Sequence, residues 1–206
     1  GQADDAGERF GRLESWTRNR FPMIESIEYH WSGEVLEPID GLAFIGHNPL
    51  DKDNVYIATG ESGNGMTHGT IAGILLTDLI VDRENEWAQL YDPSRKTLRA
   101  LPAFVKENIN VAGQLADWVT SGEVKDAGEI PPGTGAIVRR GLTKVAAFKD
   151  ENDKLHERSA VCPHLGCIVD WNSLEKTWDC PCHGSRFDAY GCVINGPANQ
   201  NLPAID

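Results

Sequence analysis

The chain contains 206 residues, a length that suits two domains better than one, since domains usually contain about 100–200 residues. Hydrophobic residues make up 40% of the chain and charged residues 24%, which argues against a disordered protein. The net charge of -12 argues against nucleic acid or an anionic membrane as the main partner. The most apolar stretch, residues 71–81, contains Gly73, Thr77 and Asp78, so we expect no membrane span. No secretory leader is visible, and we expect a cytoplasmic location.

The first part of the chain predicts short strands and a helix. Residues 1–12 are polar and contain glycine, which indicates an irregular terminus. Strand-like stretches occur at 27–31, 42–45 and 54–59, and a glycine-rich loop follows over 60–69. Apolar side chains then recur at the spacing of a helix. These positions are Ile71, Ile74, Leu75 and Leu79.

The glycine-rich loop has two interpretations. A strand, a glycine loop and a helix N-terminus together can receive an anionic group or a flat cofactor. The glycines can equally serve only as a tight connection between the strand and the helix.

The second part of the chain predicts only short antiparallel strands. An amphipathic helix is expected over 102–119 and a linker over 120–134, where turn-forming residues are frequent. We therefore predict an α+β N-terminal segment over 1–100, a helix and linker over 101–134, and an all-β domain of small antiparallel sheets over 135–206. Its strands are expected at 136–139, 144–149, 155–161, 168–171, 177–180 and 192–194.

All five cysteines follow residue 160, and four of them share two short segments with two histidines. Cys162 and His164 form one Cys–His pair, and Cys180 and His183 form the other. Two thiolates and two imidazoles can form a tetrahedral zinc site. Zinc fingers, however, usually place both cysteines in one segment of the chain and both histidines in another. One cysteine and one histidine on each arm suit a two-iron cluster, in which the cysteines bind one iron and the histidines the other.

The two segments read C-P-H-L-G-C and C-P-C-H-G-S, a pattern that resembles the Rieske iron–sulfur family. The subtype resembles the Rieske subunits of cytochrome bc complexes, since ring-hydroxylating oxygenases usually lack the additional cysteine pair. The resemblance implies a disulfide between Cys167 and Cys182 that ties the two loops together over a [2Fe–2S] cluster. The cluster ligands that it implies are Cys162, His164, Cys180 and His183.

The same resemblance gives roles to residues beyond the ligands. Ser185 matches the position whose hydroxyl donates a hydrogen bond to a bridging sulfur. Phe187 stands where high-potential members carry a tyrosine, and the loss of a donor predicts a lower potential because donors stabilise the reduced cluster. Residues 196–198 resemble the proline-containing loop that covers the cluster. Cys192 stays outside this pattern, and we expect a buried structural thiol there.

The glycine loop reads Val55-Tyr-Ile-Ala-Thr-Gly60 and then Asn64-Gly-Met-Thr-His-Gly69. This pattern resembles the C-terminal part of the glycine/D-amino-acid oxidase family of FAD-dependent oxidoreductases, in which such a loop closes over the flavin ring. The G-x-G-x-x-G fingerprint that seats the FAD pyrophosphate is missing from this sequence, so FAD is expected only in a fuller-length protein. The candidate flavin-facing positions are Gly60, Gly63, Asn64, Gly65, Met66 and Thr67.

Both resemblances together predict the C-terminal portion of an FAD-dependent oxidoreductase with a fused Rieske domain. The expected partners are a flavin domain upstream of this chain and an external redox partner, between which the cluster passes single electrons. One alternative is a stand-alone Rieske ferredoxin-type carrier whose N-terminal half is scaffold or docking surface. Another is a quinol-oxidising membrane subunit, against which Phe187 and the flavoenzyme-like first half both count.

Overall fold

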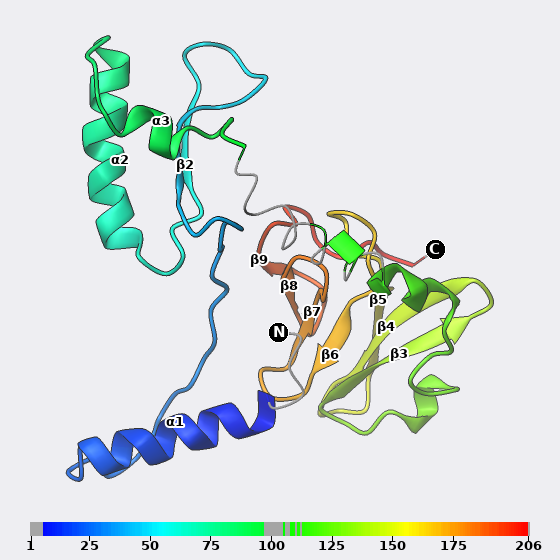
Figure 1. Cartoon of the computed structure of the whole chain (residues 1–206). Coiled ribbons are helices and arrows are strands. Elements are labelled where there is room, and N and C mark those ends of the chain that lie inside the picture. The colour runs from blue at the N-terminus through cyan, green and yellow to red at the C-terminus, as the bar shows by residue number, and fades with distance from the viewer. Residues whose placement is uncertain (1–5, 97–104, 106–107, 110, 112, 206) are drawn as a thin grey trace. The chain divides into compact units, whose positions relative to one another are not determined.

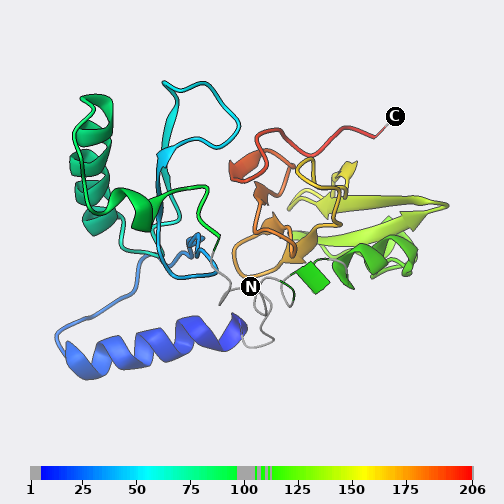
Figure 2. The ribbon, with the colours of Figure 1, turned by 45° about the horizontal axis from the view of Figure 1, so that its top comes forward.

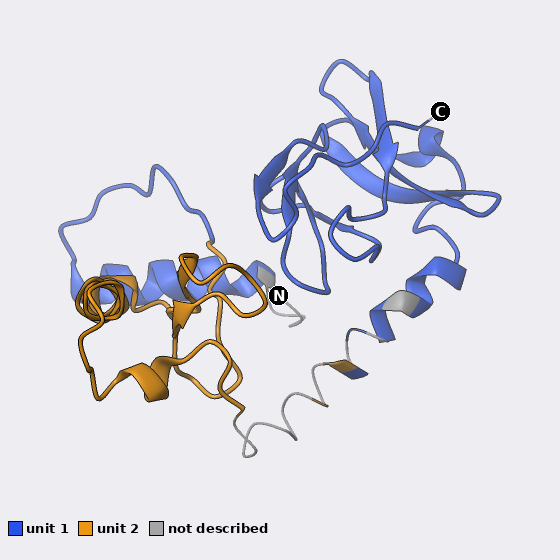
Figure 3. Cartoon of the chain, turned by 90° about the horizontal axis from the view of Figure 1, so that it is seen from above, with its two compact units in different colours: residues 1–32, 109–206 blue, residues 33–108 orange. Residues whose placement is uncertain are grey.

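The computed structural model describes residues 6–96, 105, 108, 109, 111 and 113–205 (Figure 1). The chain divides into two compact units, each of which is described by itself (Figure 3). One unit comprises Gly1–Ser32 with Ile109–Asp206, and the other comprises Gly33–Asn108. The domain boundaries predicted from the sequence stay predictions. No helix in the described part of the chain is both long enough and apolar enough to cross a membrane.

The first helix, α1 (Ala6–Arg20), corrects the expectation of an irregular terminus over 1–12. Charges rather than an apolar stripe favour this helix. Glu8 lies in its first turn and Arg18 in its last, which complements the helix dipole, and Arg18 pairs with Glu14 at 2.8 Å. Hydrophobic periodicity therefore gave no signal for it.

The described residues 33–96 of the unit Gly33–Asn108 form a hairpin and two helices. Strand β1 (Phe44–His47) pairs antiparallel with β2 (Tyr56–Thr59), and helices α2 (Gly65–Ile80) and α3 (Ala88–Tyr91) follow. The two strands and the helix after the glycine loop are thus confirmed, with shifted ends. A small core holds the unit together, and its buried residues are Ala43, Ile45, Ala72, Leu75 and Tyr91.

The strand expected at 27–31 is wrong, because these residues belong to no strand in the described part of the chain. The side chains of Tyr29 and Trp31 are exposed. Since neither face of the segment is buried, nothing fixes it in a ladder.

The C-terminal part contains a three-stranded sheet and a four-stranded sheet, both antiparallel and both in chain order (Figure 2). All six expected strands are present with shifted ends. One more strand, β8, escaped the sequence reasoning because its three residues contain a single apolar side chain. The strands are β3 (Thr134–Arg140), β4 (Thr143–Lys149), β5 (Leu155–Ser159), β6 (Asp170–Asn172), β7 (Thr177–Asp179), β8 (Arg186–Asp188) and β9 (Val193–Asn195).

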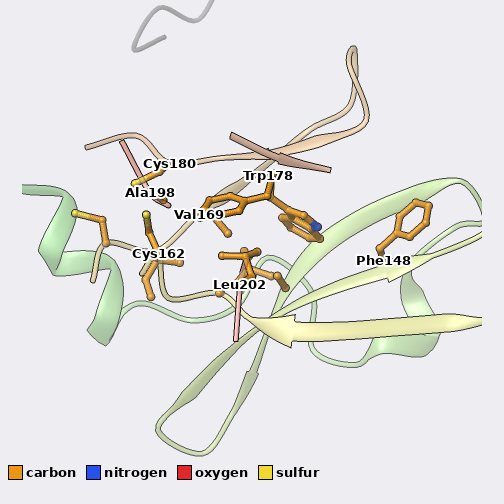
Figure 4. Packing of buried hydrophobic residues seen from close by; sticks show 13 residues of the cluster. Phe148, Cys162, Val169, Trp178, Cys180, Ala198 and Leu202 are labelled. Atoms are coloured by element: carbon orange, nitrogen blue, oxygen red, sulfur yellow. The ribbon is translucent and has the colours of Figure 1, made fainter. Parts of the chain in front are cut away.

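The main core of this part extends to the cysteine loops. Figure 4 shows Trp178 and Leu202 between Phe148 at one end and Cys162 and Cys180 at the other. The two cysteine side chains are therefore held by the same packing that stabilises the domain.

The helix expected over 102–119 lies largely outside the described residues. Those described between 105 and 114 are helical, and Leu115–Val119 form a 3-10 helix. The linker after it is attached to the sheet rather than free. Lys144, which is only 2% exposed, donates hydrogen bonds to the Thr120 hydroxyl at 3.0 Å and to the Ser121 carbonyl at 2.8 Å.

Candidate metal centre

The first cysteine loop, residues 162–167, folds back on itself through two backbone hydrogen bonds. The Cys162 N–H donates to the Cys167 carbonyl at 2.8 Å, and the Gly166 N–H donates to the Cys162 carbonyl at 3.0 Å. Gly166 has a φ of 79°, a left-handed conformation that glycine adopts without steric cost. The side chains between Cys162 and Gly166 are therefore presented at the tip of a closed loop.

The second cysteine loop, residues 180–185, repeats this backbone pattern. The Cys180 N–H donates to the Ser185 carbonyl at 2.8 Å, and the Gly184 N–H donates to the Cys180 carbonyl at 3.0 Å. Gly184 has the same φ of 79°. Two loops of one design thus each begin with a cysteine and carry a histidine at the tip.

The two leading cysteines meet in the core. Cys162 is 1% exposed and Cys180 is 4% exposed, and Figure 4 shows their sulfur atoms pointing toward one another. A hydrogen bond from the Cys180 thiol lowers the pKa of Cys162 to about 6, and the same bond raises the pKa of Cys180. A thiolate therefore forms readily at this position, and the thiolate is the form of cysteine that binds metals.

The two histidines lie beside each other, one from each cysteine loop. The rings of His164 and His183 are 4.9 Å apart and perpendicular. Burial lowers the pKa of His183, so its ring is neutral near pH 7. Its Nδ1 is buried and has no hydrogen-bond partner in the described part of the chain. A neutral imidazole with an unused buried nitrogen is what a metal ligand requires, so this donor set fits a mixed cysteine and histidine cluster.

A disulfide joins the two loops. Cys167 and Cys182 are bonded and their Cα atoms are 6.4 Å apart, a usual separation for a disulfide. The sulfur atoms of Cys167, Cys180 and Cys182 all lie within 4.8 Å of one another. Since two of these sulfurs are bonded to each other, Cys180 is the one member of this trio with a thiol to offer a metal.

Ser185, at the end of the second cysteine loop, is fully buried. Its Oγ accepts a hydrogen bond from the Ala198 N–H at 3.0 Å, which leaves the hydroxyl proton free to point elsewhere. Together with the Cys180 thiol, this hydroxyl lowers the pKa of Cys162. The hydroxyl is therefore close enough to Cys162 to stabilise its thiolate. Ala198 belongs to the segment 196–198, which brings its buried end to this pair of cysteines (Figure 4).

The Ser185→Ala variant is expected to have a lower midpoint potential, because a donor to a cluster sulfur stabilises the reduced state. A hydrogen bond of about 1 kcal/mol corresponds to about 40 mV for one electron. Protein-film voltammetry at one pH measures the shift. Thr177→Val serves as the control, since it removes another buried hydroxyl, which bonds to Asp179 at 2.8 Å. An equal shift in both variants, or none in Ser185→Ala, would contradict the assignment.

Two sequence expectations near the centre have different outcomes. Phe187 is fully buried among the core residues, so this position supplies no hydroxyl. The expectation for Cys192 is wrong, because its thiol is exposed. The physical reason is a tight turn: the Cys192 N–H donates to the Asp188 carboxylate at 2.8 Å, and the strand begins only at Val193.

Sequence reasoning also missed a contact between the 3-10 helix Leu115–Val119 and the first cysteine loop. The indole N–H of Trp118 donates to the Gly166 carbonyl at 2.8 Å. Because the acceptor is a backbone atom, no pattern of residue types could have indicated this bond.

Gly60, Gly63 and Asn64 of the candidate flavin-facing residues lie in the connection from β2 to α2, and the other three form the first turn of α2. Gly60 and Gly63 have φ values of 74° and 76°, Asn64 precedes the helix, and Met66 is exposed. A Cβ at Gly60 would come within 2.6 Å of the Pro38 ring, so this glycine is needed for close packing. A Cβ at Gly65 would meet open space. The start of the helix therefore presents an open face, with Thr67 also exposed.

Two family profiles match the chain. The profile of the Rieske [2Fe-2S] domain matches residues 120–206, and that of FAD dependent oxidoreductases matches residues 2–79. The Rieske 2Fe-2S iron-sulfur protein YhfW of Bacillus subtilis (strain 168) is 41% identical over 184 residues, which cover 89% of this chain and 36% of that protein.

Two further proteins resemble a part of the chain. The cytochrome b6-f complex iron-sulfur subunit 1 of Nostoc sp. is 57% identical over 44 residues, which cover 21% of this chain and 25% of that subunit. The plasma membrane Rieske protein PetC3 of Synechocystis PCC 6803, a crystal structure, is 29% identical and has a TM-score of 0.32, covering 35% of this chain and 74% of that one. The chain thus spans little more than a third of the Bacillus relative and a quarter of the Nostoc subunit.

The antiparallel sheets, the paired Cys–His loops and the profile match define the C-terminal part as a Rieske [2Fe–2S] domain, which is an electron-transfer module. Residues 2–79 are similar to the FAD-dependent oxidoreductase family. The chain therefore carries a Rieske iron–sulfur domain, and the segment ahead of it resembles FAD-dependent oxidoreductases. Its cofactor is a [2Fe–2S] cluster, and the oxidoreductase segment implies FAD in a fuller-length protein.

Proposed function

We propose that Cys162 and Cys180 bind one iron of the cluster and that His164 and His183 bind the other. The observation that carries this proposal is the meeting of two loops of the same design. It brings together two buried thiols, and it leaves a buried imidazole nitrogen of His183 without a partner among the described residues. The two imidazoles are neutral ligands, so the bound cluster carries less negative charge than one with four thiolates and has a higher potential.

The role that fits this site is transfer of single electrons between a flavin and an external redox partner. The cluster accepts one electron at a time, whereas a flavin handles one or two. His164 is exposed, so the histidine side of the centre is open to a partner, while the cysteine side is enclosed by the core. The protein's own residues thus insulate one side of the centre and leave the other accessible.

The flavin part of the proposal rests on the loop from Gly60 to Thr67, which would cover the flavin ring in a fuller-length protein. Support comes from the match over residues 2–79 and from the open helix N-terminus at Gly65. The identity to the Bacillus protein extends over 184 residues and hence through both parts of the chain. A stand-alone ferredoxin-type carrier gains no such support. A cytoplasmic location completes the proposal, and cell fractionation tests it.

Electron transfer from the flavin is tested in the fuller-length protein by anaerobic reduction of the flavin. We expect the flavin absorbance to bleach first and the EPR signal of the reduced cluster to follow. A reduced flavin beside a cluster that stays oxidised, although dithionite reduces it, would contradict the proposal.

The 206-residue chain is expected to keep its cluster but not to retain stoichiometric FAD, because it lacks the G-x-G-x-x-G unit that seats the pyrophosphate. Extraction of the purified chain followed by flavin fluorescence measures this. One FAD per chain would show that the segment has been misinterpreted.

A further inference from the structure

A charged network lies on the four-stranded sheet next to the second cysteine loop. Arg186 directly follows Ser185 and forms a bidentate pair with the Asp179 carboxylate. Its Nε donates to Oδ1 at 2.9 Å and its Nη2 donates to Oδ2 at 3.0 Å. Its remaining nitrogen, Nη1, is 3.1 Å from Oε2 of Glu175, in the turn between β6 and β7. One guanidinium therefore faces two carboxylates. Asn172 also donates to Oε2 of Glu175 at 3.4 Å, whereas Oε1 receives no donor from the described residues of this sheet.

Ser32 supplies the missing donors from a distant part of the chain. Its N–H donates to Oε1 of Glu175 at 2.9 Å, and its hydroxyl donates to Oε2 at 2.6 Å. The same hydroxyl accepts a hydrogen bond from Nη1 of Arg186 at 2.9 Å. Ser32 is separated from Glu175 by 143 positions and from Arg186 by 154.

The anchoring groups are mostly buried and held in place before Ser32 is considered. The side chain of Glu175 is 16% exposed and that of Arg186 is 21% exposed. Asn172 donates to Oδ2 of Asp179 at 2.9 Å, which fixes the far side of the network. Burial alone raises the pKa of Glu175, but the hydrogen bonds from Ser32 and the charge of Arg186 lower it overall. The carboxylate is therefore charged and oriented to accept a backbone N–H and an adjacent hydroxyl.

We propose that Glu175 and Arg186 form a docking site on the Rieske domain for the Ser32 segment of the FAD-dependent oxidoreductase part. Ser32 is the last residue of the segment that shares a compact unit with Ile109–Asp206, so the whole contact lies within that unit. Ser32 lies within the residues that match the oxidoreductase family, while Arg186 follows the second cysteine loop. The docking therefore attaches the Ser32 segment to the cluster-bearing sheet, and it does not depend on which residues ligate the iron.

Hydrogen exchange of the cluster-loaded, full 206-residue chain tests the docking. Glu175→Gln removes the charge of the carboxylate that accepts hydrogen bonds from the Ser32 N–H and hydroxyl. The Ser32 amide is then expected to exchange at least about tenfold faster, because a charge-assisted hydrogen bond is lost. Glu157→Gln is the matched control, because Glu157 pairs with Arg140 in the other sheet. The EPR signal of the cluster is expected to be unchanged in both variants, which separates this result from the proposed ligand set.

Ser32→Ala tests the same contact without altering the Rieske domain, and so decides the matter even where Glu175→Gln impairs folding. Ser32→Ala is expected to accelerate amide exchange at residue 32. The variant that combines Ser32→Ala with Glu175→Gln is expected to exchange no faster than Glu175→Gln alone, because both substitutions break the same interaction. Unchanged exchange in Ser32→Ala, purely additive effects, or equal acceleration in Glu157→Gln would overturn the proposal.

Discussion

Replacement of Cys162 by alanine is expected to yield a chain that contains no intact [2Fe–2S] cluster. Cys162 is buried and opens the first cysteine loop, and the proposed cluster has no other thiolate there, since Cys167 is held in the disulfide. One iron would then keep a single protein ligand. Iron analysis and EPR after reduction measure the loss.

Cys192→Ala is the matched control for this experiment, because it removes a cysteine of the same domain whose thiol is exposed. It is expected to keep full cluster content. A normal Rieske-type EPR signal in Cys162→Ala, or its loss in Cys192→Ala, would refute the ligand assignment.

The Cys167→Ser variant is expected to assemble the cluster but to lose it faster under heat or oxidant. The disulfide closes a loop with a sequence separation of 15, and a crosslink of that length stabilises the folded state by about 3 kcal/mol. Without it, the two loops that enclose the centre can separate more often. Decay of the visible absorbance at a fixed temperature, compared with the unchanged protein, gives the difference.

Cys167→Ser combined with Cys182→Ser controls for the thiol that the single variant leaves free. The double variant is expected to behave like the single one, since both lack the same bond. If Cys167→Ser never binds iron, even under anaerobic reconstitution, then Cys167 is a cluster ligand and not part of a stabilising disulfide.

The all-β character of the cluster domain could be predicted because its chemistry and its strands have local signals. Cys–His pairs at fixed spacing mark the two loops, and glycines at 166 and 184 allow both loops to close with left-handed backbone. Strands such as β4 carry a nearly continuous buried run, which is visible in the sequence. Both loops therefore lie where the sequence indicated.

Other features left no such signal. Helix α1 depends on charge placement rather than on an apolar face, and β8 is too short to show a period. The docking of Ser32 on Glu175 joins residues 143 positions apart, and the bond from Trp118 ends on a backbone carbonyl. Cys192 was misjudged because a hydrogen-bonded turn at Asp188, and not the strand, determines its exposure.

The central claim is tested most directly by metal and sulfide analysis of the chain purified without oxygen, followed by EPR. The proposed site predicts two irons and two inorganic sulfides per chain, with the rhombic signal of a mixed cysteine and histidine cluster after reduction. Stoichiometric zinc without visible absorption would contradict it.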